Sequence, residues 1–436
     1  MTGAEAGFNL WWGLLGLSPL FLYIILVFWD VDPLPATAIC VVVGAVITSQ
    51  NLLSFGNALA KSMGSFLALV GLIVMMGRGL GEVLTATKVT HTIVHKIVYG
   101  IGVETEKQVI LGTILSCSVV IALLGTMTGG NAILAPIVLP IAAQVGLSRS
   151  SIGVIFQAVG EEALILGPFT PPVVTLLGLT KIGYGEMLLY VSGPIACLTL
   201  VITWFMVQKI QRQTKEKFPY AKQDVAQFIP TAQNKRATAI FGLLFFIAVV
   251  YGIWVKASTS YVIVIMLGLA VVTGLVGGLN FDNILKLFAK GMAGNVYLFF
   301  LFLILDPFIN YVEQAGGFKA LTVLLNPLIE YGGKTAVVIA GGLIGAFGIS
   351  GAVVAELKML HEMFNPILVK YSVSMLPWAV ALVVATRVTN FIYPGGNMVA
   401  CLGLAESTDI KSALKNGWAV GICQSIFLIV YAFLFS

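Results

Sequence analysis

Continuous apolar runs, separated by short polar stretches, cover nearly the whole chain. Most of them are long enough to cross a bilayer as a helix, which takes about 20 apolar residues, and none alternates between apolar and polar positions as barrel strands do. Two shorter segments, 50–63 and 281–292, are predicted to be helices at the membrane interface. The pattern predicts an all-α polytopic membrane protein with spans near 10–29, 35–49, 65–85, 108–126, 131–145, 149–166, 184–208, 238–256, 260–279, 295–312, 334–349, 352–370, 374–392 and 416–435.

The composition supports this class of protein. Hydrophobic residues make up 58% of the 436 residues and charged residues only 10%, whereas soluble domains carry about 25% charged residues. The first apolar run has no basic leader and no cleavage site, so we interpret it as a retained span. The five cysteines are scattered singly over apolar segments, and this spacing predicts neither a disulfide framework nor a metal site.

The two halves of the chain carry similar features in the same order. The corresponding pairs are NLLSFGNALAKSMG (51–64) with NFDNILKLFAKGMAG (280–294), GTMTGGN (125–131) with GAFGISG (345–351), and FTPPVVTLLGL (169–179) with IYPGGNMVACL (392–402). The alternative is a chance alignment of two apolar sequences. We interpret the shared order as an internal repeat.

A basic segment separates the two halves. Between Lys209 and Arg236 lie seven Lys or Arg residues and two acidic residues, which indicates a cytoplasmic loop under the positive-inside rule and not a nucleic-acid patch. Neither terminus carries Lys or Arg beyond its terminal span, so both termini are predicted to be extracytoplasmic. The chain is thus predicted to contain a first transmembrane repeat (1–208), a cytoplasmic linker (209–236) and a second, inverted transmembrane repeat (237–436), in the cell inner (cytoplasmic) membrane.

Four Gly- and Pro-rich stretches interrupt apolar segments, at 125–131, 167–172, 345–351 and 393–397. Irregular backbone inside a membrane is tolerated only where it is buried in protein or lines a cavity. Breaks at corresponding positions of two repeats indicate the binding site of a secondary transporter. Because 131–145 is short and contains two prolines, we predict a re-entrant hairpin there, with an ordinary kinked span as the alternative.

Polar side chains and glycines near the breaks are the candidates for a substrate site. Hydroxyl and amide groups add ligands without adding charge, and the amino ends of half-helices attract anions. A guanidinium group can bind a carboxylate through two parallel hydrogen bonds. The predicted substrate-binding residues are Thr126, Thr128, Gly130, Asn131, Thr170, Ser350, Arg387, Asn390 and Asn397.

Acidic residues inside apolar segments are the candidates for a coupling-ion site. A charge at the centre of a span costs about 2.5–3.5 kcal/mol on insertion scales, so each one suggests a function. The predicted coupling-ion residues, which could bind Na⁺ or carry a proton, are Glu161, Glu162, Asp306 and Glu356. Adjacent residues on a helix point about 100° apart, so we expect only one of Glu161 and Glu162 to face the site.

Structural roles are the alternatives for these charges. One member of the acidic pair could form an ion pair with Arg387 or Lys358, and Lys358 could instead pair with Glu356. Asp306 precedes Pro307, so it could cap a helix that restarts there. The sequence leaves these alternatives open.

GTMTGGNAILAPIVLPIA (125–142), GPFTPPVVTLLG (167–178) and their second-half counterparts resemble the ion transporter superfamily. This superfamily includes NhaC-type sodium/proton antiporters and the gluconate, C4-dicarboxylate and citrate carriers. The resemblance implies a homodimer in which a transport domain moves like an elevator against a scaffold. It also implies substrate and Na⁺ sites at 126–131, 167–175, 348–351 and 389–397. GTMTGG and GAFGISG stand where the dicarboxylate branch has Ser-Asn-Thr, so a dicarboxylate substrate is not implied.

Two transport hypotheses follow. The first is a secondary carrier of a small organic anion or amino acid, coupled to Na⁺ or H⁺, in which Arg387 binds the carboxylate and Glu161 or Glu162 takes the coupling cation. The second is a sodium/proton antiporter without an organic substrate. An enzyme is not predicted, because the chain has no zinc motif and no complete P-loop. The expected partners are the substrate, the lipid bilayer and a second copy of the chain, with no nucleic acid and no cofactor.

Overall fold

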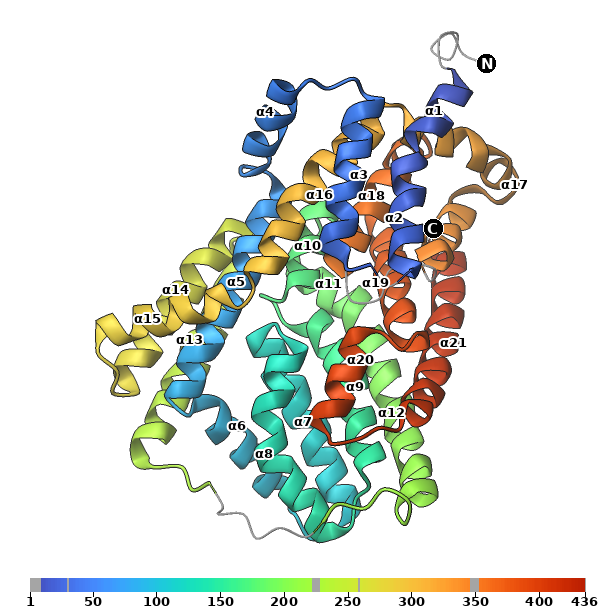
Figure 1. The fold of residues 1–436 in the computed structure, drawn as a ribbon. Coiled ribbons are helices and arrows are strands. Elements are labelled where there is room, and N and C mark those ends of the chain that lie inside the picture. The colour runs from blue at the N-terminus through green and yellow to red at the C-terminus, as the bar shows by residue number, and fades with distance from the viewer. Residues whose placement is uncertain (1–8, 30, 222–227, 258, 346–352, 436) are drawn as a thin grey trace.

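The computed structural model describes residues 9–29, 31–221, 228–257, 259–345 and 353–435. Within these ranges every regular element is a helix (Figure 1). Eleven of the described segments are long and apolar enough to cross a membrane. These observations confirm the prediction of an all-α polytopic membrane protein.

The elements of the first half follow the predicted spans closely. The sequence analysis missed the short helices between the spans, namely Val89–Ile101 and Pro171–Thr180, because they are too short to give a membrane-length apolar run. The elements are α1 (Leu10–Gly16), α2 (Ser18–Phe28), α3 (Pro33–Ile47), α4 (Leu52–Ser62), α5 (Phe66–Ala86), α6 (Val89–Ile101), α7 (Glu106–Leu124), α8 (Met127–Val145), α9 (Arg149–Leu166), α10 (Pro171–Thr180), α11 (Tyr184–Met187), the π-helical turn η1 (Leu188–Ser192) and α12 (Gly193–Thr214).

The second half has fewer described elements, and the predicted repeat stays a prediction. Its elements are α13 (Ala232–Trp254), α14 (Thr259–Val276), α15 (Phe281–Ala293), α16 (Val296–Gln314), α17 (Gly317–Gly345, kinked at Gly333), α18 (Val353–Lys370), α19 (Met375–Ile392), α20 (Gly396–Leu404) and α21 (Ile410–Phe435).

The short helices α4 and α15 provide the clearest local match between the halves. Each begins after an asparagine whose side-chain oxygen accepts a hydrogen bond from a backbone N–H three residues later: Asn51 from Ser54 and Asn280 from Asn283, both at 2.8 Å. This is the preferred way to satisfy a free donor at a helix start. The two predicted interfacial helices therefore share both their position in the order and their capping.

Two long helices, α9 and α19, form the buried centre of the molecule. Every residue from 150 to 165 on α9 and from 377 to 391 on α19 is buried. The helix α9 packs against α7, α12, α20 and α21, whereas α19 packs mainly against α17 and α21. Glu161 and Glu162 on α9 and Arg387 on α19 are therefore enclosed by other helices.

Each of these central helices ends at a break followed by a short helix. α9 ends at Leu166, and α10 begins with Pro171, whose missing N–H is not needed in a first turn. α19 ends at Ile392, and Pro394 lies between it and α20. The predicted breaks at these two places are present.

The other predicted interruptions need correction. The break predicted at 125–131 is confined to two residues, because Gly125 adopts a left-handed φ of 66° and α8 already begins at Met127. Two prolines lie inside α8 without ending it. The suggested cap at Asp306 is wrong, because α16 runs continuously through Pro307. The break predicted at 345–351 lies outside the described residues, apart from Gly345.

Gly79 on α5 allows α15 to pack closely against α5. A methyl group added at Gly79 would lie 2.7 Å from the backbone oxygen of Phe288. Gly79→Ala is therefore expected to displace α15 and to destabilise the protein by about 1–3 kcal/mol, as overpacking does elsewhere. Thermal melting of the detergent-purified protein measures this as a lower midpoint.

Gly268→Ala, on α14, is the matched control for Gly79→Ala. Nothing lies within 4 Å of the added methyl group, and alanine favours a helix by up to about 1 kcal/mol over glycine. The melting midpoint of this variant should stay the same or rise. Equal midpoints for the two variants would contradict a role of the Gly79 contact in stability.

Candidate functional site

Arg387 and Glu161 form an ion pair at the centre of the molecule. Arg387 lies on α19 and Glu161 on α9, and their side chains are 0% and 1% exposed. Nη1 of Arg387 donates to Oε2 of Glu161 and to the Glu161 backbone oxygen, in both cases at 2.6 Å. The structure thus joins two residues that the sequence placed in corresponding helices of the two halves.

A second contact sets the relative direction of α9 and α19. Nε2 of Gln157 on α9 donates to the backbone oxygen of Asn390 at 3.3 Å. Since Gln157 meets Asn390 while Glu161 meets Arg387, the two helices run antiparallel where they cross. An inverted repeat requires this arrangement of its corresponding helices.

Glu162 points away from this ion pair. Its Oε1 accepts a hydrogen bond of 2.9 Å from Nε2 of Gln424 on α21, and the same nitrogen lies 2.7 Å from the hydroxyl oxygen of Thr199 on α12. The neighbouring carboxylates therefore contact different helices, as their separation of about 100° predicts. Both are buried, and the expectation that only one of them faces the site stays a prediction.

Glu356 is the third buried carboxylate. It lies in the first turn of α18, and its Oε1 is 3.3 Å from the hydroxyl oxygen of Thr389, on the same helix as Arg387. Lys358 pairs with Glu362 one turn further along α18. The local Glu356–Lys358 pair considered from the sequence is therefore absent.

The charges of this buried cluster do not cancel. Glu161, Glu162 and Glu356 are at most 6% exposed, and Arg387 is the sole buried Lys or Arg in the described part of the chain. Three carboxylates with one guanidinium would carry a net charge of −2 if all were ionised. Burying a charge without a counter-ion costs several kcal/mol. Protons or metal cations therefore have to supply the missing positive charge.

Several polar atoms of the cluster have no hydrogen-bond partner within the described ranges. They are Nε and Nη2 of Arg387, Oε2 of Glu162, Oε2 of Glu356 and Oε1 of Gln424. An unsatisfied buried polar atom costs about 1–3 kcal/mol. The cluster therefore offers free acceptors to a cation and free donors to an anion.

The arrangement limits how a cation could be bound. Among the described residues, no three His, Cys, Asp or Glu side chains are close enough to share a metal ion. A cation at this cluster would use at most two carboxylates, together with amide, hydroxyl or backbone oxygens. Oxygen ligands of this kind suit hard cations and not transition metals.

Two further predicted residues lie beside the cluster. The Asn397 side chain, near the start of α20, contacts the Glu161 carboxylate. Asn390 is buried on α19, where its amide donates to the Thr386 backbone oxygen at 3.0 Å. Ser350, also predicted, lies outside the described residues.

Asn131 connects α8 to three other helices. Its amide donates to the Phe156 backbone oxygen at 2.9 Å and to Sγ of Cys401 at 3.2 Å, and its oxygen accepts from Sγ of Cys117 at 3.4 Å. The Asn131 amide thus uses its nitrogen and its oxygen in hydrogen bonds to other helices. In this conformation Asn131 therefore positions α8 against α7, α9 and α20.

The other residues predicted at the first break lie around the start of α8. Thr126 caps α8 by accepting from the Gly129 backbone N–H at 3.4 Å. Gly130 is buried and faces Ile121 closely, so a larger residue would not fit. Thr128 is half-buried. No contact in the described structure joins these three residues to Arg387 or the carboxylates.

Thr170 acts on the backbone of the break between α9 and α10. Its hydroxyl lies 2.5 Å from the Leu164 oxygen and 2.8 Å from the Gly167 oxygen. Tyr184 donates to the next free carbonyl, that of Leu166, at 2.6 Å. These side chains satisfy carbonyls that a helix end otherwise leaves open. In this conformation the Thr170 hydroxyl is therefore occupied by backbone carbonyls.

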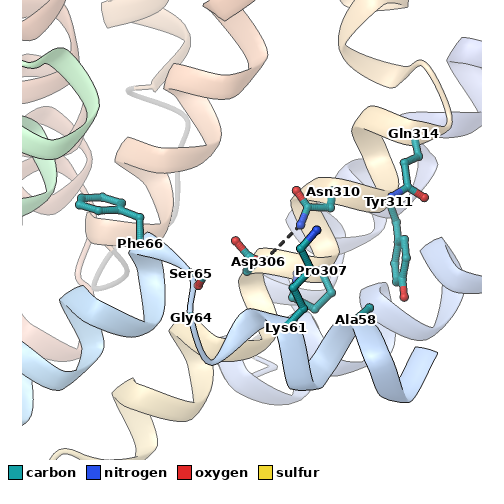
Figure 2. Close-up of a pocket in the computed structure, with 10 residues that line it drawn as sticks. All are labelled: Ala58, Lys61, Gly64, Ser65, Phe66, Asp306, Pro307, Asn310, Tyr311 and Gln314. Carbon is teal, nitrogen blue, oxygen red and sulfur yellow. Dashed lines mark hydrogen bonds between the residues drawn. The ribbon is translucent and has the colours of Figure 1, made fainter. Parts of the chain in front are cut away.

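Asp306 is not part of the central cluster. It lies on α16 beside a cavity at the start of α5, together with Lys61 and Asn310 (Figure 2). Its charged neighbours are Lys358, Lys61 and Glu362. The structure thus divides the predicted coupling-ion residues between two places.

The sequence analysis missed the amides and hydroxyls that support the carboxylates. Gln424, Thr199 and Gln157 were absent from the predicted site. Gln424 does carry a signal, because it interrupts the apolar run of the last span, where a glutamine is costly unless it has a partner. Its partner, Glu162, lies far away in sequence and could not be identified without the structure.

Comparison with known proteins gives one family match. Residues 11–183 match the Na⁺/H⁺ antiporter family. This match covers most of the first predicted repeat, including α9 with Glu161 and Glu162. No curated protein matches the chain.

Two solved transporter structures have a fold similar to that of this chain over most of its length. The YdaH transporter of Alcanivorax borkumensis is 17% identical with a TM-score of 0.63, covering 96% of this chain and 98% of that chain. MtrF of Neisseria gonorrhoeae, described among a class of antimetabolite efflux pumps, is 15% identical with a TM-score of 0.51, covering 88% of this chain and 85% of that chain. At these identities the likeness shows a shared fold.

The fold, the apolar helices and the family match together support a multi-pass membrane transporter, and not an enzyme. A specific relation to NhaC-type antiporters or to the organic-anion carriers stays a prediction.

Proposed function

We propose that the chain is a sodium/proton antiporter that exchanges Na⁺ for H⁺ at the cluster of Glu161, Glu162, Glu356 and Arg387. The observation that carries the proposal is the charge imbalance of the cluster, three buried carboxylates to one guanidinium. Such a cluster requires added positive charge, and either H⁺ or Na⁺ can supply it. The match of the first half to a Na⁺/H⁺ antiporter family supports this choice.

The residues divide into a fixed pair and two exchangeable carboxylates. Arg387 and Glu161 neutralise each other and hold α19 against α9. Glu162 and Glu356 each keep one oxygen without a partner in the described structure, so each can take a cation. A proton on a carboxylate removes the charge that attracts Na⁺, so the two cations compete for the same group. That competition couples the movement of one ion to the movement of the other.

Release of the ions requires motion of the central helices. In this conformation the three carboxylates are closed off from solvent. They lie on α9 and α18, and two of them, Glu161 and Glu356, contact α19. The cluster is close to the two breaks that separate α9 from α10 and α19 from α20. Short helices joined by irregular backbone can be displaced without unfolding a long helix. We infer that movement at these breaks exposes the cluster alternately to the two sides of the membrane.

A carrier for a small organic anion or amino acid is the second candidate. The observation that favours it is the pair of unpartnered donors on Arg387, Nε and Nη2, which could bind a substrate carboxylate. The similar fold of MtrF, from a class of antimetabolite efflux pumps, is compatible with an organic substrate. In that case the carboxylates would couple substrate movement to Na⁺ or H⁺.

Proteoliposomes with a trapped pH dye and an acidic interior distinguish the two candidates. External NaCl should make the interior more alkaline, whereas choline chloride at matched membrane potential should not. Glu313→Gln, which alters an exposed residue of α16, should behave like the unmodified protein. Absence of a Na⁺-driven signal would contradict the antiporter. A signal that appears only after a carboxylate or amino acid is added would favour the carrier.

A further inference from the structure

A cavity lies apart from the buried charge cluster, between α4, the start of α5 and α16 (Figure 2). Its volume is about 600 Å³, within the range of about 300–1,000 Å³ that small-molecule sites occupy. Its walls include two charged residues, Lys61 and Asp306, that the proposed ion exchange does not use. The cavity therefore needs an explanation of its own.

The two charges of the cavity have opposite sign and belong to different helices. Lys61 lies in the last turn of α4, and Asp306 lies on α16, where its Oδ2 accepts from the Asn310 amide at 3.2 Å. Lys61 extends toward Asn310 and Asp306 (Figure 2). Yet Lys61 and Asp306 are not among the ion pairs of the described residues. A molecule with one positive and one negative group could bridge them.

One helix end adds to the charges of the cavity. The 21-residue helix α5 begins there after Ser65, and its amino end contributes partial positive charge to the wall. Tyr311 belongs to the wall as well, but its side chain is 2% exposed and its hydroxyl is closed off from the cavity, so a bound molecule would meet the charged groups instead.

The helix α4, which lies beside this cavity, has the pattern of an interfacial helix. Its polar positions alternate with apolar ones at helical spacing, and Leu52 and Leu53 are 88% and 75% exposed. Such a helix lies in the membrane interface with its apolar side chains among the lipids. The cavity lies beside this helix, so a lipid head group at the interface could enter it from the side of α4.

We propose that this cavity binds a molecule carrying an ammonium group and an anionic oxygen group, with the ammonium on Asp306 and the anion on Lys61. An aminophospholipid head group and a small free zwitterion share this chemistry. The bound molecule would hold α4 against α16 through both charges. This site is independent of the proposed ion exchange.

Thermal melting of the delipidated protein in detergent tests the proposal. Phosphatidylethanolamine should raise the melting midpoint by about 3 °C or more at saturation. Phosphatidylglycerol lacks the ammonium group and should raise it less. Free phosphoethanolamine, added without lipid, identifies a soluble source if it gives the same rise at millimolar concentration.

Two variants and two matched controls locate the effect. Asp306→Asn and Lys61→Gln should each abolish the rise in melting midpoint with phosphatidylethanolamine. Glu313→Gln, exposed on α16, and Lys290→Gln, at the corresponding place on α15, should keep it. The proposal is overturned if phosphatidylglycerol stabilises the protein as well as phosphatidylethanolamine does. It is also overturned if the first two variants respond like the controls.

Discussion

Replacing Arg387 by alanine is expected to abolish transport and to lower the stability of the protein. The substitution removes the sole buried cation of the described chain and leaves Glu161, Glu162 and Glu356 without compensation. Removal of one partner of a buried ion pair costs about 3–5 kcal/mol. We expect Na⁺-driven proton movement to fall by more than about 100-fold, equivalent to roughly 2.7 kcal/mol. Proteoliposome assays and thermal melting measure the two effects.

A double variant separates the structural effect from the transport effect. Glu161→Gln combined with Arg387→Met removes both charges of the pair, and such replacements are often neutral for stability. Its melting midpoint should therefore recover toward that of the unmodified protein, while transport stays lost. Transport by Arg387→Ala within a few-fold of the unmodified protein would contradict the role assigned to the pair.

The helical architecture could be predicted from the sequence, because a bilayer accepts only long apolar segments whose backbone groups are hydrogen-bonded. A span needs a long apolar run, and this rule located α5, α9 and α19 to within a few residues. Proline and glycine located the breaks after α9 and α19, because these residues disturb helical backbone. Short helices such as α6 and α20 were missed, since their length gives no membrane-spanning signal.

The candidate site was predictable only in part. The cost of a charge inside a membrane is enough to single out Glu161, Glu162, Glu356 and Arg387 from the sequence alone. The same rule grouped Asp306 with them, although α16 places it in a different cavity. Distance along the chain carries no information about which buried charges meet. The pairing of Glu161 with Arg387 and of Glu162 with Gln424 became clear only from the packing of α9 against α19 and α21.

The neighbouring carboxylates Glu161 and Glu162 should respond in opposite ways to the same substitution. Glu162→Gln removes a charge that has no cationic partner in contact, and the new amide can keep the hydrogen bond to Gln424. We expect its melting midpoint to stay the same or rise. Glu161→Gln deprives Arg387 of its counter-ion, and its midpoint should fall by several degrees. Thermal melting at neutral pH compares the two variants directly.

Both substitutions are nevertheless expected to abolish Na⁺-driven proton movement. Glu162→Gln removes a carboxylate that we propose exchanges Na⁺ for H⁺, so a gain in stability should accompany the loss of transport, as is common where a strained site performs the function. If protons and Na⁺ compete for this group, the Na⁺ concentration that gives half-maximal transport should rise as the pH falls. Transport by Glu162→Gln at the unmodified rate, with the same pH dependence, would assign the exchange to Glu356 alone. A lower melting midpoint for Glu162→Gln than for Glu161→Gln would contradict the proposed division into a fixed pair and exchangeable carboxylates.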